Sequence, residues 1–172
     1  MEKRSLAEIT ALVVHCSDST FGNAALIDKW HKERGWEGIG YHFVILNCYS
    51  SSKEHKEETP LASNDGEIEA GRPLDCVGAH AIGINQTSIG ICLIGVNEFT
   101  GRQIDSLVAK ILELEHSLGR KLRILGHREV NVGKTCPNIS PDYLRNLMQT
   151  TRDAMNGERS NRKNPTIQLE RE

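Results

Sequence analysis

The stretch Ser88-Ile89-Gly90-Ile91-Cys92-Leu93-Ile94-Gly95 is almost continuously apolar. A strand that is buried on both faces has this composition, whereas a half-exposed strand alternates apolar and polar residues. The stretch therefore predicts a central strand in a sheet that is covered on both sides. Four shorter segments have the composition of further strands: residues 11–15, 41–46, 67–69 and 122–125.

Segments with helical periodicity lie between and after these predicted strands. Residues 23–34 carry apolar side chains at helical spacing, and a glycine follows them. Thr100 and Gln103 fit a capping box that opens the longest predicted helix, residues 101–118. A serine followed by a proline begins a last predicted helix at about 141–149. Strands that alternate with helices indicate a mixed α/β fold, with a central mixed β-sheet flanked by helices.

The length of 172 residues favours one main domain, which we expect over residues 1–149. Within it, residues 47–65 are polar and rich in turn formers, which predicts a surface excursion between two strands. Residues 150–172 are polar and of mixed charge, which predicts a flexible or weakly held tail.

Composition narrows the classes of partner. The net charge of -2 and the lack of a dense Lys/Arg stripe argue against a nucleic-acid partner. Nothing in the sequence approaches an apolar span long enough to cross a membrane, so no membrane insertion is expected. The first eight residues lack the apolar core of a secretory signal, which predicts a protein that is made and initially kept in a cytoplasm.

The five cysteines are odd in number and have no regular spacing, which argues against a disulfide framework. Cys92 lies inside the apolar run and is expected in the core. Cys136 differs, because it lies in a polar loop within Lys134-Thr135-Cys136-Pro137. A metal ligand is one role that would keep such a thiol unpaired.

Two histidines join Cys136 as candidate metal ligands. His15 ends the predicted strand 11–15, and His127 directly follows the predicted strand 122–125. Two imidazoles and a thiolate are zinc ligands, and structural zinc usually takes four protein ligands, whereas catalytic zinc takes three and leaves a place for water. The set of three therefore indicates an enzyme. Taken alone, the position of His15 favours a hydrogen-bonded core histidine over a ligand.

Other polar residues have simpler interpretations. In an extended segment Lys134 projects to the same side as Cys136, near a bound metal, although its position alone favours a solvated loop lysine. His31, His55 and His116 are expected at solvated positions, and His80 lies among small residues that would leave its imidazole accessible.

A series of sequence blocks resembles the phage-lysozyme branch of the zinc N-acetylmuramoyl-L-alanine amidases, to which the animal peptidoglycan recognition proteins are more distant relatives. The blocks follow the family order over about residues 9–147. They are His15-Cys16-Ser17, Trp30-His31-Lys32-Glu33-Arg34-Gly35-Trp36, Gly40-Tyr41-His42-Phe43, Glu69-Ala70-Gly71-Arg72, Gly78-Ala79-His80-Ala81, Asn85, Ser88-Ile89-Gly90-Ile91, Gly126-His127-Arg128-Glu129-Val130 and Lys134-Thr135-Cys136-Pro137.

The resemblance implies one Zn²⁺ per chain on His15, His127 and Cys136, and catalytic roles for Tyr41 and Lys134. The implied reaction is hydrolysis of the amide between N-acetylmuramic acid and L-alanine in bacterial peptidoglycan. Further expectations concern four residues around the site: His80 and Asn85 contact the substrate, and Arg128 and Glu129 support the ligands. The stretch from about residue 47 to 63 is longer than the turn usual in the phage branch.

The implied biological role is that of a phage or prophage endolysin in host cell lysis. Such an enzyme accumulates in the host cytoplasm and acts on the cell wall after release; a monomer is expected. Two alternatives stay open. One is a non-catalytic peptidoglycan-binding module, which would be expected to lack Cys136. The other is an inhibitor of phage RNA polymerase, for which the sequence contains no recognisable motif. A structural zinc site is disfavoured by the three-ligand set.

Overall fold

The computed structural model describes residues 1–163 and the side chains up to residue 157. Its five-stranded sheet has the order β3-β2-β4-β1-β5. Strand β4 (Ser88–Leu93) lies at the centre, parallel to β1 (Ala11–Cys16) on one side and to β2 (Phe43–Ile45) on the other. Strand β5 (Arg123–Gly126) is parallel to β1, and β3 (Ile68–Ala70) is antiparallel to β2. The predicted mixed sheet with a central apolar strand is confirmed.

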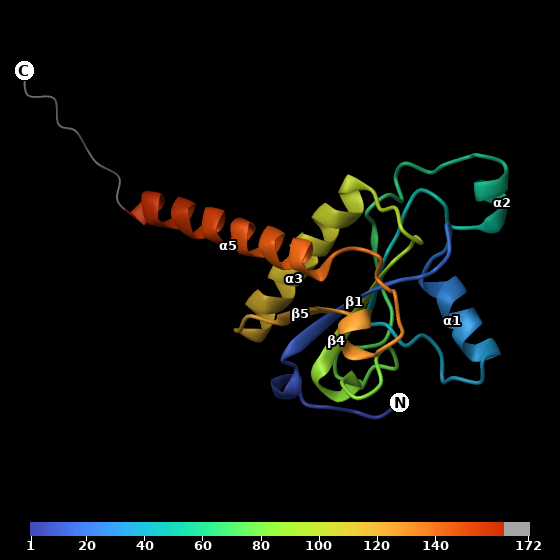
Figure 1. Ribbon diagram of the computed structural model, residues 1–172, viewed down its shortest axis with the longest axis horizontal. Coiled ribbons are helices and arrows are strands. Elements are labelled where there is room, and N and C mark those ends of the chain that lie inside the picture. Colours follow the sequence, from blue (N-terminus) through green and yellow to red (C-terminus); the bar gives the residue numbers. More distant parts are fainter. Residues whose placement is uncertain (164–172) are drawn as a thin grey trace, which may run out of the picture. The chain divides into compact units, whose positions relative to one another are not determined.

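Two longer helices lie to either side of the strands (Figure 1). Helix α1 (Ala24–Glu33) begins after the cap Asn23, and α3 (Gly101–Leu118) begins with the predicted capping box and ends at a left-handed glycine. Ile27 of α1 packs in a cluster with Val44 and Cys92. His15 is the register partner of Cys92, so it lies on this same face of the sheet.

The excursion over residues 47–65 contains a short helix, α2 (Ser52–Lys56), that the sequence interpretation did not include. The Ser51 hydroxyl accepts the backbone N–H of Glu54, and the Glu54 carboxylate accepts the N–H of Ser50 at 2.7 Å. The first bond satisfies an N–H group in the first turn of the helix, and the second ties the preceding residue to that turn, even in a polar segment.

The predicted end of the last helix, near residue 149, is wrong. Helix α5 (Pro141–Lys163) continues through the first part of the expected tail. Side-chain contacts along this helix include a bond from Gln149 to Asp153 at 2.8 Å, the i,i+4 type that supports a polar helix. Residues 1–141 and the described residues from Asp142 onward fall into two compact units. The rest of the predicted tail, 164–172, lies outside the described residues.

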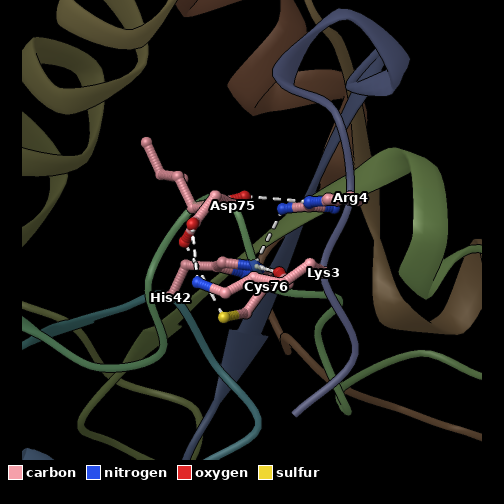
Figure 2. A network of polar contacts seen from close by, with 6 residues as sticks. Lys3, Arg4, His42, Asp75 and Cys76 are labelled. Carbon is pink, nitrogen blue, oxygen red and sulfur yellow. Dashed lines mark hydrogen bonds and ion pairs between the residues drawn. The ribbon is translucent and has the colours of Figure 1, made fainter.

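Polar contacts of the Arg4 side chain hold the segment before β1 against the sheet (Figure 2). Its Nη2 lies 2.8 Å from Nε2 of His42, and Lys3 forms an ion pair with Asp75 at 2.6 Å. The Arg4 guanidinium also donates to the backbone carbonyls of Leu74, Asn85, Gln86 and Ser88. One side chain thus holds together the segments that precede β1 and β4.

His42, which is 1% exposed, makes this part of the core sensitive to acid. Burial, followed by the charge of Arg4, lowers the pKa of His42 from 6.5 to about 4, although its bond with the Cys76 carbonyl opposes the shift. Between those two pH values the unfolded chain binds a proton that the folded chain does not. We therefore expect the free energy of unfolding to fall as the pH is lowered through this window, by an amount on the order of 3 kcal/mol.

Urea unfolding at a series of pH values measures this dependence. The variant His42→Asn is the control, because an amide oxygen can accept the N–H of Gly90 as Nδ1 of His42 does at 3.0 Å, but it does not titrate. The wild type is expected to lose more stability than the variant between pH 6.5 and 4. Equal slopes for the two proteins would contradict the assignment to His42.

Candidate metal centre and active-site cleft

The three predicted ligands come together at one edge of the sheet. His15 lies at the end of β1, and His127 follows β5 as the first residue of α4 (His127–Val130). Because β1 and β5 are neighbouring parallel strands, their carboxyl ends deliver both rings to the same edge. One ligand atom each from His15, His127 and Cys136 lie within 4.8 Å of one another.

The loop that carries Cys136 is held against the ends of three strands. A Cβ at Gly126 would lie 2.9 Å from Cδ of Pro137, so the glycine allows the loop to approach the end of β5. The backbone N–H of Cys16, at the end of β1, donates to Sγ of Cys136 at 3.1 Å. The Asn138 side chain donates to the carbonyl of Val96, just after β4, at 2.6 Å. These contacts place the thiol beside the two rings.

Each candidate imidazole is oriented by a bond through Nε2. His127 Nε2 lies 3.0 Å from Oδ1 of Asn131, and His15 Nε2 lies 3.1 Å from Nδ1 of His80. Because Asn131 offers an oxygen that only accepts, the neutral ring of His127 carries its proton on Nε2 and its lone pair on Nδ1. Nδ1 of His15 lies 3.9 Å from Sγ of Cys136. A second bond of this kind is typical of histidines that bind metals.

Burial keeps the two imidazoles in the form that a metal requires. Burial, followed by His80 and His127, lowers the pKa of His15 well below its usual value, and burial lowers the pKa of His127. The Cys16 thiol and burial raise the pKa of Cys136, while the N–H of Cys16 opposes them. Neutral imidazole binds metals directly, whereas a thiol must first release its proton.

Two of the candidate ligands, His127 and Cys136, line a cleft of about 350 Å³. Tyr41 and Lys134, the two predicted catalytic residues, both line this cleft with the ligands His127 and Cys136. The ring of Tyr41 lies 5.0 Å from that of His15, and burial, followed by the nearby thiols, raises the pKa of Tyr41 well above its usual value. Lys134 is exposed and also lines a neighbouring depression of about 530 Å³.

Two histidines that were expected to be accessible are buried. His31 accepts the N–H of Gly40 through Nδ1 at 3.0 Å, and its ring lies 5.5 Å from that of Tyr41. The missed signal is its spacing, because His31 is four residues from the core residue Ile27 on the same helical face. His80 is also buried, and its Nδ1 lies 3.1 Å from Nε2 of His15.

The remaining predicted residues lie near the cleft and have defined contacts. Asn85 and His80 border the depression of about 530 Å³, and their contact with substrate stays a prediction. The Glu129 carboxylate accepts the N–H of Gly126 at 2.9 Å, which caps the turn that presents His127. Arg128 donates to the carbonyl of Ile139 at 3.0 Å and so ties that turn to the loop beyond Cys136.

Residues 5–139 match the family model described as N-acetylmuramoyl-L-alanine amidase. The chain therefore belongs to the N-acetylmuramoyl-L-alanine amidase family, and the enzyme class predicted from the sequence is confirmed. It is 36% identical to the endolysin of Escherichia phage T7, over 75% of this chain and 80% of the relative. It is 32% identical to the endolysin of Klebsiella phage KP32, over 77% and 82% of the two chains.

Solved structures agree with this assignment. The N-acetylmuramoyl-L-alanine amidase LysC from Clostridium intestinale URNW superposes with a TM-score of 0.68 at 29% identity, over 84% of this chain and 89% of that one. Drosophila PGRP-LB shares the fold, with a TM-score of 0.59 at 24% identity, over 80% and 76% of the two chains. Among the described residues, no helix is long and apolar enough to span a membrane.

Proposed function

We propose that the protein is a zinc-dependent amidase that cleaves the bond between N-acetylmuramic acid and L-alanine in peptidoglycan, as a phage or prophage endolysin. The observation that carries this proposal is the group of His15, His127 and Cys136, whose ligand atoms lie within 4.8 Å of one another. Two members of the group, His127 and Cys136, line a cleft. Tyr41 and Lys134 border the same cleft.

The donor set fits zinc. Two imidazole nitrogens and one thiolate sulfur are ligands that zinc favours, and three protein ligands correspond to a catalytic rather than a structural site. When bound, zinc supplies a Lewis acid that polarises a carbonyl and lowers the pKa of water towards about 7. The presence of Cys136 argues against the non-catalytic peptidoglycan-binding alternative, for which loss of this ligand is the expected mark.

Tyr41 and Lys134 have complementary roles in this proposal. The raised pKa of Tyr41 keeps its hydroxyl protonated at neutral pH, so the hydroxyl can donate a hydrogen bond that orients the attacking water or can assist protonation of the leaving amine. Lys134 is exposed at the rim, from which its ammonium can reach the substrate carbonyl. There it would stabilise the negative charge that develops on the carbonyl oxygen.

The relatives that are named endolysins support a role in the lysis of a bacterial host. In this role the protein collects in the host cytoplasm and reaches peptidoglycan after release. A monomeric state and an interaction with phage RNA polymerase stay predictions from the family resemblance.

Mass spectrometry of digested sacculi tests the proposed reaction. An amidase releases stem peptides that begin with a free L-alanine amino group and leaves the glycan strands intact. New reducing ends on the sugars, or cuts within the peptides, would contradict the proposal. Binding to sacculi without any cleavage would instead indicate a peptidoglycan-binding module.

A further inference from the structure

A buried chain of polar side chains runs from the candidate ligand His15 into the protein. Nε2 of His15 lies 3.1 Å from Nδ1 of His80, and Nε2 of His80 lies 3.4 Å from Oγ of Ser88. The Ser88 hydroxyl donates to the carbonyl of Ile84 at 2.7 Å. His15 and Ser88 are fully buried, and His80 nearly so. Such a chain has to satisfy all of its donors and acceptors internally.

The carbonyl at the end of this chain sets the proton positions along it. The carbonyl oxygen of Ile84 can only accept, so the Ser88 hydroxyl donates its hydrogen to that oxygen. The Ser88 oxygen in turn accepts from Nε2–H of His80. The neutral ring of His80 then carries its lone pair on Nδ1, which accepts from Nε2–H of His15. This leaves the lone pair of His15 on Nδ1, the atom that lies 3.9 Å from Sγ of Cys136.

The surroundings of His80 fix its ring in this place. A Cβ at Gly90 would lie 2.5 Å from Cγ of His80, and a Cβ at Gly78 would lie 2.5 Å from its Cδ2. Both glycines are therefore needed for the ring to fit. The Asn85 side chain accepts the N–H groups of His80 and Ala81 at 2.9 and 2.8 Å, which holds the backbone that carries the ring.

We propose that His80 is a positioning residue for metal binding, because it accepts the Nε2–H of His15 and so fixes the orientation and tautomer in which His15 presents Nδ1. Ser88 and Asn85 hold His80 in that state. The inference rests on the proposed function, since it takes His15 to be a zinc ligand. It gives His80 and Asn85 a role inside the protein that does not require contact with substrate.

Zinc dissociation constants, measured by competition with a chromophoric chelator, test this role in the full chain. In His80→Leu the side chain fills the buried space but has no acceptor, so zinc binding is expected to weaken by about 10- to 100-fold. In His80→Asn the side chain is smaller, but Oδ1 takes the place of Nδ1 as an acceptor. The asparagine variant is expected to bind zinc more tightly than the leucine variant.

A role in packing alone predicts the opposite order, because leucine fills the space better than asparagine. Wild-type affinity in His80→Leu, or weaker binding in His80→Asn than in His80→Leu, would overturn the inference. Failure of the wild type to bind zinc would overturn the proposed function itself. The measurement therefore distinguishes failure of the inference about His80 from failure of the proposed function.

A second measurement needs no variant. Long-range ¹H–¹⁵N spectra of the metal-free wild type report which nitrogen of His15 carries the proton. The inference expects the proton on Nε2, and a proton on Nδ1 would overturn it even if the leucine variant failed to fold.

Discussion

Removal of bound metal with a chelator is expected to abolish the cleavage of muropeptides, and added zinc is expected to restore it. The three ligand atoms within 4.8 Å of one another provide a soft donor set beside the cleft, and an amide is too poor an electrophile to be hydrolysed there without a Lewis acid. The measurement is the rate of muropeptide cleavage before chelation, after it and after zinc is added. Full activity of the metal-free protein would contradict the metal-dependent mechanism.

The variant Cys136→Ser tests the same site through a ligand. Serine is a poor zinc ligand at neutral pH, so this variant is expected to lose both zinc and detectable activity. The thermal midpoint provides a second readout, because zinc at about 100 times its dissociation constant adds about 2.7 kcal/mol to the stability of a protein that binds it. Zinc should therefore raise the midpoint of the wild type but not of Cys136→Ser.

Cys48→Ser is the matched control for this variant. Cys48 is another unpaired cysteine, and it lies in the excursion between β2 and β3, away from the ligand group. It is expected to keep both zinc binding and activity. Equal losses in the two serine variants would point to a general need for thiols rather than to a metal ligand at residue 136.

The variant Lys134→Ala is expected to keep zinc and to lose at least about 10²-fold in kcat, the usual effect of removing one group that stabilises an oxyanion. Lys134 lines the cleft beside Cys136, and its side chain is exposed, so its loss removes a positive charge without opening a cavity. The measurement is steady-state cleavage of a defined muropeptide by the zinc-loaded protein.

Lys121→Ala is the control for the change of charge. Lys121 is also exposed, and it lies before β5, at the end of that strand opposite to His127. The kcat of Lys121→Ala is expected to equal that of the wild type. Unchanged turnover in Lys134→Ala would return Lys134 to the role of a solvated loop lysine.

Local patterns in the sequence were sufficient to predict most of the fold. The apolar run that became β4 required burial on both faces, and the box formed by Thr100 and Gln103 marked the start of α3. The candidate ligands His15 and His127 were predictable for a related reason: each ends or follows a strand, and neighbouring parallel strands end at the same edge.

The environment of His80 was not predictable in this way. Its burial depends on His15, which is 65 residues away in the sequence, and on space left by Gly78 and Gly90. No periodic pattern in the sequence predicts this burial, because it arises only when the segment that carries His80 packs against the completed sheet. Helix α2 was missed for a different reason, since a short polar helix that is held by its own caps has no apolar period to detect.

The distance in sequence between the candidate ligands has a consequence for how the protein matures. His15 and Cys136 are separated by 121 residues and come from β1 and from the loop beyond the last strand, β5. A metal shared by them would act as a cross-link around most of the chain, and closing so large a loop is unfavourable in an unfolded chain. On the proposed function, the metal would therefore be held fully only after β1 and the loop beyond β5 have come together, because a chain that lacks Cys136 has two of the three ligands.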